Sequence, residues 1–263
     1  MEIDYGKIFG KAAAYALSGH RLMPMFAINS AMLLSAFMLV QGILASGSLG
    51  ALFSAIGTFV IILIIIALAS IFFVTAYVHD ASDYWKGKDL DVSHSYRYAK
   101  NKYLKMLGAT VLVGIVSSAI SMMDVSLPIV NIPFGIIIGL IFMMYTPIIV
   151  LESKGLINSM KESYSIFMHN KFDVLAYWWL LSGIQMAIFL LSLIPLAIFA
   201  WPAITAAISG VPVAQAMQAN AATISFGILG MAAVMSYSTI FGIASLTFMY
   251  AYVKRVRTRK SSK

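Results

Sequence analysis

Three long stretches of the chain carry almost no formal charge, and this feature restricts the possible folds most strongly. Residues 22–79 and 174–253 contain no Asp, Glu, Lys or Arg, and residues 106–151 contain only Asp124. Charged residues make up 11% of the 263 residues and hydrophobic residues 61%, whereas charged residues are about 25% of ordinary soluble domains. A lipid bilayer is the solvent that suits such stretches, so we predict an all-α polytopic membrane protein.

Each stretch is too long for one crossing, since about 20 helical residues span the hydrocarbon core of a bilayer. Each stretch also has a turn signal near its middle, at residues 46–50, 124–133 and 201–222, where Gly, Ser, Asp or Pro interrupt the apolar run. We therefore predict a single membrane domain with six transmembrane helices in three hairpins. The predicted helices cover residues 23–45, 51–79, 106–123, 132–151, 174–199 and 224–252.

The basic residues predict the orientation of these helices. All 18 lysines and arginines fall in residues 7–21, 86–105, 154–171 and 254–263. Cytoplasmic loops of membrane proteins carry an excess of Lys and Arg, so we predict a multi-pass protein of the cell membrane with both termini and a basic tail, residues 254–263, in the cytoplasm. Asp124 is then an external acid, best interpreted as a solvated turn residue. The net charge of +8 fits a membrane surface, and no nucleic-acid partner is expected.

A short amphipathic helix is predicted before each hairpin, at the cytoplasmic interface. The three segments align on Tyr15, Tyr96 and Tyr164, which indicates internal repeats at about residues 1–79, 90–152 and 155–253. Helices of this kind lie in the headgroup layer with their basic face towards anionic lipid. The residues predicted to contact anionic lipid are Lys7, Lys11, Arg21, Arg97, Lys100, Lys102, Lys254, Arg255 and Arg257.

One short motif resembles a known family. It consists of the run from Pro147 to Glu152, then Gly155, then Ser159 to Ser163. The motif is similar to a recurrent feature of the six-helix prokaryotic membrane proteins named for the membrane domain of glycerophosphodiester phosphodiesterase, and of their archaeal relatives of unknown function. The resemblance implies the six-helix fold and a prokaryotic source. It implies no phosphodiesterase activity, because that activity belongs to a separate soluble barrel domain for which residues 1–263 leave no room.

Several uncharged polar residues fall inside the predicted spans. They either line a hydrophilic cavity or make interhelical hydrogen bonds of about 0.6 kcal/mol each, and we favour packing. These residues are Asn29, Gln41, Tyr145, Gln185, Ser236, Tyr237, Ser238 and Thr239.

Small residues and prolines also predict how the helices pack. Gly135 and Gly139 have the GxxxG spacing that lets two helix backbones approach closely; the partner is another helix of the chain or a second subunit, and we favour an internal contact. Pro147 and Pro195 are expected to kink their helices. The external segment 200–222 contains a predicted short helix at 213–220 and is interpreted either as a lid or docking surface or as a long connector.

His79, Asp80 and Asp83 form a polar cluster at the end of the second predicted helix, with His94 nearby in sequence. His79 and Asp83 are one helical turn apart and are able to share a metal ion, but ordinary interfacial polar residues are the favoured interpretation, so no metal or cofactor is expected. The motifs HExxH and G-x-S-x-G and the P-loop are all absent. An enzyme acting on lipid headgroups is therefore the least favoured function.

We thus expect a non-enzymatic integral membrane protein, either an accessory subunit or a lipid-organising scaffold. Its expected partners are membrane lipids, anionic on the cytoplasmic face, and other membrane subunits or a second copy of itself. The alternative is a transporter or channel for a small neutral or amphipathic solute.

Overall fold

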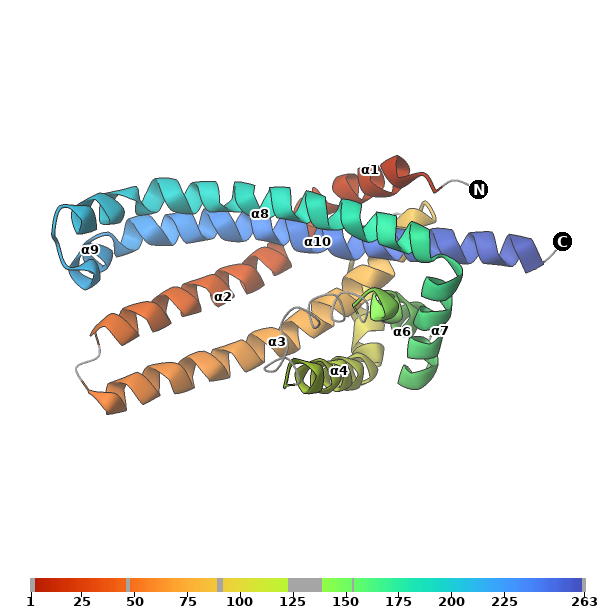
Figure 1. Ribbon diagram of the computed structural model, residues 1–263, viewed down its shortest axis with the longest axis horizontal. Coiled ribbons are helices and arrows are strands. Elements are labelled where there is room, and N and C mark those ends of the chain that lie inside the picture. The colour runs from red at the N-terminus through yellow and green to blue at the C-terminus, as the bar shows by residue number, and fades with distance from the viewer. Residues whose placement is uncertain (1–2, 46–47, 89–91, 123–138, 153, 262–263) are drawn as a thin grey trace. The chain divides into compact units, whose positions relative to one another are not determined.

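The protein is described by a computed structural model covering residues 3–45, 48–88, 92–122, 139–152 and 154–261. These residues are helical, with no strand among them, which confirms the predicted all-α class (Figure 1). The elements are α1 (Tyr5–Ala16), α2 (Gly19–Ala45), α3 (Leu49–Trp85), α4 (Val92–Met122), α6 (Tyr145–Glu152), α7 (Leu156–His169), α8 (Lys171–Ile208), α9 (Val213–Ala219) and α10 (Ala221–Ser261).

Four of the described helices are long and apolar enough to cross a membrane, in agreement with a multi-pass membrane protein. The candidate spans are Gly19–Leu44, Leu49–Trp85, Lys171–Ile208 and Ala221–Arg255, and residues 139–152 form a shorter apolar helical stretch. The other two predicted spans fall in α4 and in residues 132–151. Asp124, Gly135 and the predicted turn at 124–133 lie outside the described residues.

Several helices run further than predicted. α3 ends at Trp85, where Gly87 adopts a φ of 81°, and α8 ends at Ile208, where Gly210 adopts a φ of 91°. At both ends the glycine N–H and the N–H that follows it bond back to the last helical turn, the usual C-terminal arrangement with glycine in the left-handed conformation. The predicted end of this helix at residue 199 is therefore wrong, because α8 continues through Pro202 to Ile208. The turn at 209–212 lies within the break predicted at 201–222. α9 agrees with the short helix predicted at 213–220.

The segments before the predicted hairpins differ from one another. α1 and α7 are separate short helices, as predicted. α7 ends at His169, and Asn170 alone separates it from α8. The second segment is not a separate helix, because α4 runs unbroken from Val92 to Met122. The polar cluster there contains neither Gly nor Pro, the residues that most disfavour a helix, and consists of Lys100, Asn101 and Lys102.

The two prolines expected to kink helices have different surroundings. A turn at Met143 and Met144 precedes α6, so Pro147 lies in the first turn of that helix. The N–H groups of a first turn have no partner within the helix, so proline costs no hydrogen bond there. Pro195 lies within α8, which continues on both sides of it. The predicted kink at Pro147 is therefore a helix break at 143–144.

The chain divides into two compact units. Unit 1 comprises residues 1–16, 71–183 and 241–263, and unit 2 comprises residues 17–70 and 184–240. Unit 1 has a core of Val78, Met106, Ala109, Ile149 and Val150, and unit 2 has one of Ala203, Ile224 and Ile228.

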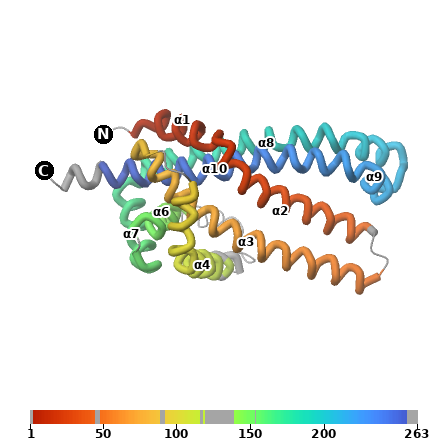
Figure 2. The backbone as a smooth tube through the Cα atoms, turned by 180° about the vertical axis from the view of Figure 1, so that it is seen from behind, coloured from red at the N-terminus to blue at the C-terminus, as the bar shows by residue number. Residues whose placement is uncertain are grey.

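In unit 2, α8 and α10 approach closely, and they lie side by side in both views (Figures 1 and 2). A Cβ added at Gly230 would lie 2.7 Å from the Pro195 Cβ, and one added at Gly227 would lie 3.0 Å from the Leu196 Cα. Only glycine fits these positions, so Gly227 and Gly230 allow the two backbones to approach closely. By contrast, a Cβ at Gly139 would meet no heavy atom of the described residues within 4 Å.

Candidate functional site

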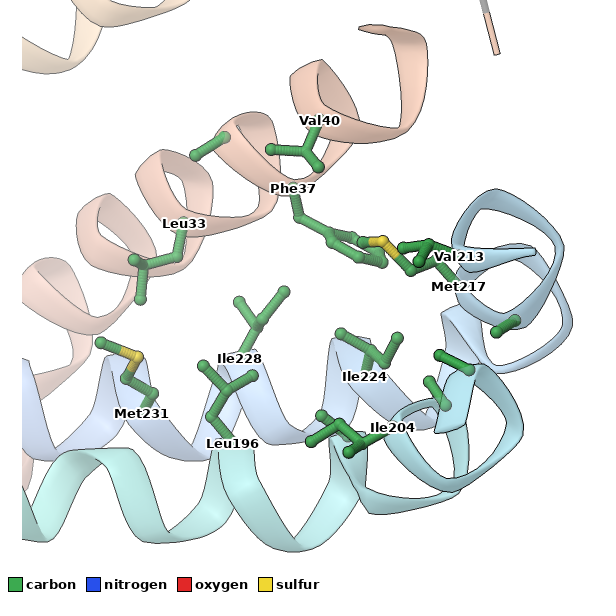
Figure 3. A pocket seen from close by; sticks show the side chains of 15 residues that line it. Leu33, Phe37, Val40, Leu196, Ile204, Val213, Met217, Ile224, Ile228 and Met231 are labelled. Carbon is green, nitrogen blue, oxygen red and sulfur yellow. The ribbon is translucent and has the colours of Figure 1, made fainter. Parts of the chain in front are cut away.

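Unit 2 contains a cavity of about 530 Å³ between α2, α9, the C-terminal part of α8 and the N-terminal part of α10 (Figure 3). Its volume lies within the range of about 300–1,000 Å³ that is usual for small-molecule sites. The lining residues are all apolar: Leu33, Ala36, Phe37, Val40, Leu196, Ala200, Ala203, Ile204, Ala207, Val213, Ala216, Met217, Ile224, Ile228 and Met231.

Each helix lines the cavity with one face. The lining residues recur three or four positions apart, for example Leu33, Phe37 and Val40 on α2 and Ile224, Ile228 and Met231 on α10, which is the spacing of one helical face. α9 is brought to the cavity by the turn at residues 209–212. Both faces of these helices are apolar in sequence, so the spacing of apolar residues does not predict which face lines the cavity.

The predicted in-span polar residues contribute no side chain to this cavity, as far as the described residues show. Asn29 and Ser236 are both buried, and the Asn29 amide Nδ2 donates to the Ser236 Oγ at 2.9 Å. Ser236 donates in turn to the Ala232 carbonyl, and Thr239 donates to the Met235 carbonyl. Gln41, Gln185, Tyr237 and Ser238 are half-buried, and Tyr145 packs against the core of unit 1.

Unit 1 contains a charged network centred on Glu152, the last residue of α6. Its carboxylate accepts hydrogen bonds from the Tyr250 hydroxyl and from Lys254 Nζ, at 2.5 Å for the lysine. Lys154 Nζ lies 2.5 Å from the other carboxylate oxygen and also contacts Glu162 of α7. The network therefore joins the C-terminal end of α6 to α7 and α10.

The charges of this network determine how its groups titrate. Burial acts to raise the pKa of the Glu152 carboxyl, but the hydrogen bonds from Lys154, Lys254 and Tyr250 outweigh it and lower the pKa to about 2. Hydrogen bonds to Glu152 and Glu162 raise the pKa of the Lys154 ammonium group. The sequence analysis identified Glu152 only as part of the family motif and predicted that Lys254 contacts lipid. It did not predict a contact between these two residues.

Asp80 is buried next to the N-terminal helix. Its Oδ2 accepts a hydrogen bond of 2.7 Å from the hydroxyl of Tyr15, and both side chains are almost fully buried. The same hydroxyl lies 3.3 Å from the Tyr77 carbonyl oxygen. Asp80 therefore joins α1 to α3. It does not belong to the cluster formed by its sequence neighbours His79 and Asp83.

His79 and Asp83 meet His94 instead. His79 Nδ1 lies 3.8 Å from Asp83 Oδ2, and one ligand atom from each of the three side chains lies within 4.8 Å of the others. The His79 ring stacks on Tyr98 with ring centroids 3.9 Å apart.

The basic residues predicted to contact lipid have varied surroundings. Lys7, Arg97, Lys100, Lys254 and Arg255 are exposed, whereas Arg21 is buried and donates to the Ser18 hydroxyl. Lys11 lies over the Trp85 ring and Lys102 over the Tyr98 ring. Arg257 lies within α10.

No family model, curated protein or solved structure matches this chain. The resemblance carried by residues 147–163 therefore stays a prediction.

Proposed function

We propose that this chain is a non-enzymatic membrane protein that binds lipid and acts as a lipid-organising scaffold or an accessory subunit. The observation that carries the proposal is the cavity of unit 2, whose 15 lining residues are all apolar (Figure 3). Its ligand is proposed to be a lipid acyl chain. α2, α8 and α10 contribute to the lining from candidate membrane spans, so acyl chains are the apolar molecules present at the highest concentration around them.

The proposed topology has six membrane helices in three hairpins, with α1, α7 and the start of α4 at the cytoplasmic interface. Both termini are proposed to be cytoplasmic, in the cell membrane of a prokaryote, and the three hairpins are proposed to be repeats. The positions of all 18 basic residues support this arrangement. In this topology the cavity lies in the external half of the bilayer, and the exposed basic residues contact anionic headgroups on the cytoplasmic side.

Cysteine labelling tests the topology without interference, because the natural chain contains no cysteine. Ser209→Cys and Asp124→Cys should react with a membrane-impermeant maleimide in intact cells, whereas Lys7→Cys should react only after lysis. Labelling of Lys7→Cys in intact cells would contradict the proposed orientation. Protection of Asp124→Cys would contradict the second hairpin.

Native mass spectrometry of the protein, extracted from its own membrane in mild detergent, tests lipid binding. The wild type should retain about one phospholipid per chain. Ala200→Phe places a ring in the cavity and should abolish that retention, whereas Ala67→Phe, on an exposed face of α3, should leave it unchanged. Equal retention by all three proteins would contradict a site in the cavity.

The same purified protein, reconstituted in liposomes, distinguishes the scaffold or subunit from the alternative function of a transporter or channel. A transporter for a small neutral or amphipathic solute would move that solute in reconstituted liposomes, and Gln185→Leu or Tyr237→Phe would abolish the flux. Such a result would replace the scaffold proposal.

A further inference from the structure

Unit 1 brings two histidines and one aspartate together from two helices. His79 and Asp83 lie one turn apart on α3, and His94 lies in the first turn of α4. We propose that these three side chains bind a divalent transition-metal ion, with Zn²⁺ the best match. The inference is independent of lipid binding in unit 2.

The distance between the His79 and Asp83 side chains is close to the spacing of two ligands in a metal site. His79 Nδ1 and Asp83 Oδ2 are 3.8 Å apart, beyond the range of about 2.7–3.2 Å for a hydrogen bond. Zinc bonds of about 2.0–2.2 Å to nitrogen and oxygen place neighbouring ligands of a tetrahedral site about 3.3 Å apart. These two atoms therefore need to approach by only a few tenths of an ångström.

The third ligand needs a larger movement, and its position permits it. The ligand atoms of the three residues are at most 4.8 Å apart, so closing the site requires a shift of roughly 1.5 Å from a tetrahedral spacing of about 3.3 Å. His94 is exposed in the first turn of α4. Rotation of its side chain makes this shift without disturbing a packed core.

Neighbouring side chains hold the two α3 ligands in place. The Tyr98 ring stacks on the His79 ring. The Ser95 Oγ lies 3.1 Å from His79 Nδ1, the nitrogen proposed to bind the ion, so metal binding replaces this contact. Lys86 Nζ contacts Asp83 Oδ1 at 3.4 Å, which leaves Oδ2 facing His79. Lys86 is itself half exposed and is displaced easily. The stacking on Tyr98 and the Lys86 contact are supporting contacts of the kind that orient the ligands of metal sites in proteins.

The donor set selects the kind of metal. Two imidazoles and one carboxylate suit Zn²⁺ and its neighbours, whereas Ca²⁺ and Mg²⁺ prefer oxygen ligands alone. The side chains of His79 and Asp83 are 13% and 12% exposed, and His94 lies at the surface. Three protein ligands with one side open to solvent leave a fourth position for water.

Isothermal titration of the purified full-length chain with Zn²⁺, after treatment with a chelator and without a histidine tag, tests the proposal. The wild type should bind one Zn²⁺ per chain, and His94→Ala should weaken binding by at least tenfold, since even changes to the residues that support ligands cost about 10–100-fold. His20→Ala is the matched control, because His20 is also exposed but lies outside the cluster. It should bind as the wild type does.

Asp83→Asn keeps the shape of the side chain and provides a second test, with size-exclusion profiles showing that each variant is folded. Zn²⁺ should raise the melting temperature of the wild type and of His20→Ala but not that of Asp83→Asn or His94→Ala. The absence of saturable binding to the wild type would overturn the proposal. Equal affinity of the wild type and His94→Ala would do the same.

Discussion

Replacing Glu152 with Gln should destabilise the protein by about 2–4 kcal/mol. The substitution keeps the shape of the side chain but removes the charge that Tyr250, Lys154 and Lys254 contact. Tyr250 is buried, and weakening the acceptor of a buried donor costs about 1–3 kcal/mol. Each pair with a partly exposed lysine adds about 0.2–1 kcal/mol.

The pKa of Glu152 provides a second route to this magnitude. Its decrease from 4.5 to about 2 corresponds to at most about 3.4 kcal/mol of stability at neutral pH. Solvent around the partly exposed lysines screens these charges, so about 2 kcal/mol is the more realistic value. The two routes therefore agree at the lower end of the predicted range.

Thermal unfolding in detergent at pH 7 measures the effect. A loss of 1 kcal/mol lowers the melting temperature by roughly 2–4 °C for a chain of 150–250 residues, so a loss of about 2–4 kcal/mol in Glu152→Gln should lower it by roughly 4–16 °C. Glu162→Gln is the matched control, because Glu162 bonds to Lys154 but not to Tyr250, and it should change the melting temperature little. In a double-mutant cycle, Tyr250→Phe should have a smaller effect in the Glu152→Gln background than in the wild type.

The effect should also depend on pH. Because the pKa of Glu152 is lower in the folded state, its contribution is fully present above about pH 4.5 and is lost as the pH falls towards 2. The melting temperatures of the wild type and Glu152→Gln should therefore converge over this interval. Equal melting temperatures for Glu152→Gln and Glu162→Gln at pH 7, or a difference that does not narrow in acid, would refute the reasoning.

Two further substitutions, one in each unit, test the packing by thermal unfolding. Tyr15→Phe removes the hydrogen bond to the buried Asp80 carboxylate and should cost about 1–3 kcal/mol; an unchanged melting temperature would show that the bond is not needed. Gly230→Ala places a methyl group 2.7 Å from the Pro195 Cβ and should cost about 1–3 kcal/mol. Gly183→Ala, which meets nothing within 4 Å, should be neutral or stabilising by up to about 1 kcal/mol.

The helical class was predictable because it depends on charge and hydropathy, which the sequence states directly. Helix ends were less predictable. Pro202 was interpreted as part of a break, but α8 continues to Ile208 and ends before the left-handed Gly210. Proline is tolerated inside membrane helices where neighbouring groups satisfy the freed carbonyls, and the sequence does not show those neighbours.

The candidate sites were less predictable than the fold, since they depend on contacts between distant segments. Tyr250 is 98 residues away from Glu152, and no periodicity relates the two. His79 and Asp83 were recognised from their helical spacing, but Asp80 was grouped with them although it bonds to Tyr15. The GxxxG spacing drew attention to Gly135 and Gly139, whereas the close approach that the structure describes involves Gly227 and Gly230.

A cavity without a hydrogen-bonding side chain has a consequence for selectivity. With no donor or acceptor among the side chains that line it, the site has nothing to distinguish one headgroup from another. If it holds an acyl chain as proposed, it would discriminate only by volume and shape, through contacts that each contribute about 0.1–0.2 kcal/mol per atom pair. Chain length, branching and unsaturation would then set its preference, so occupancy would follow the fatty-acid composition of the membrane, which cells adjust with growth temperature.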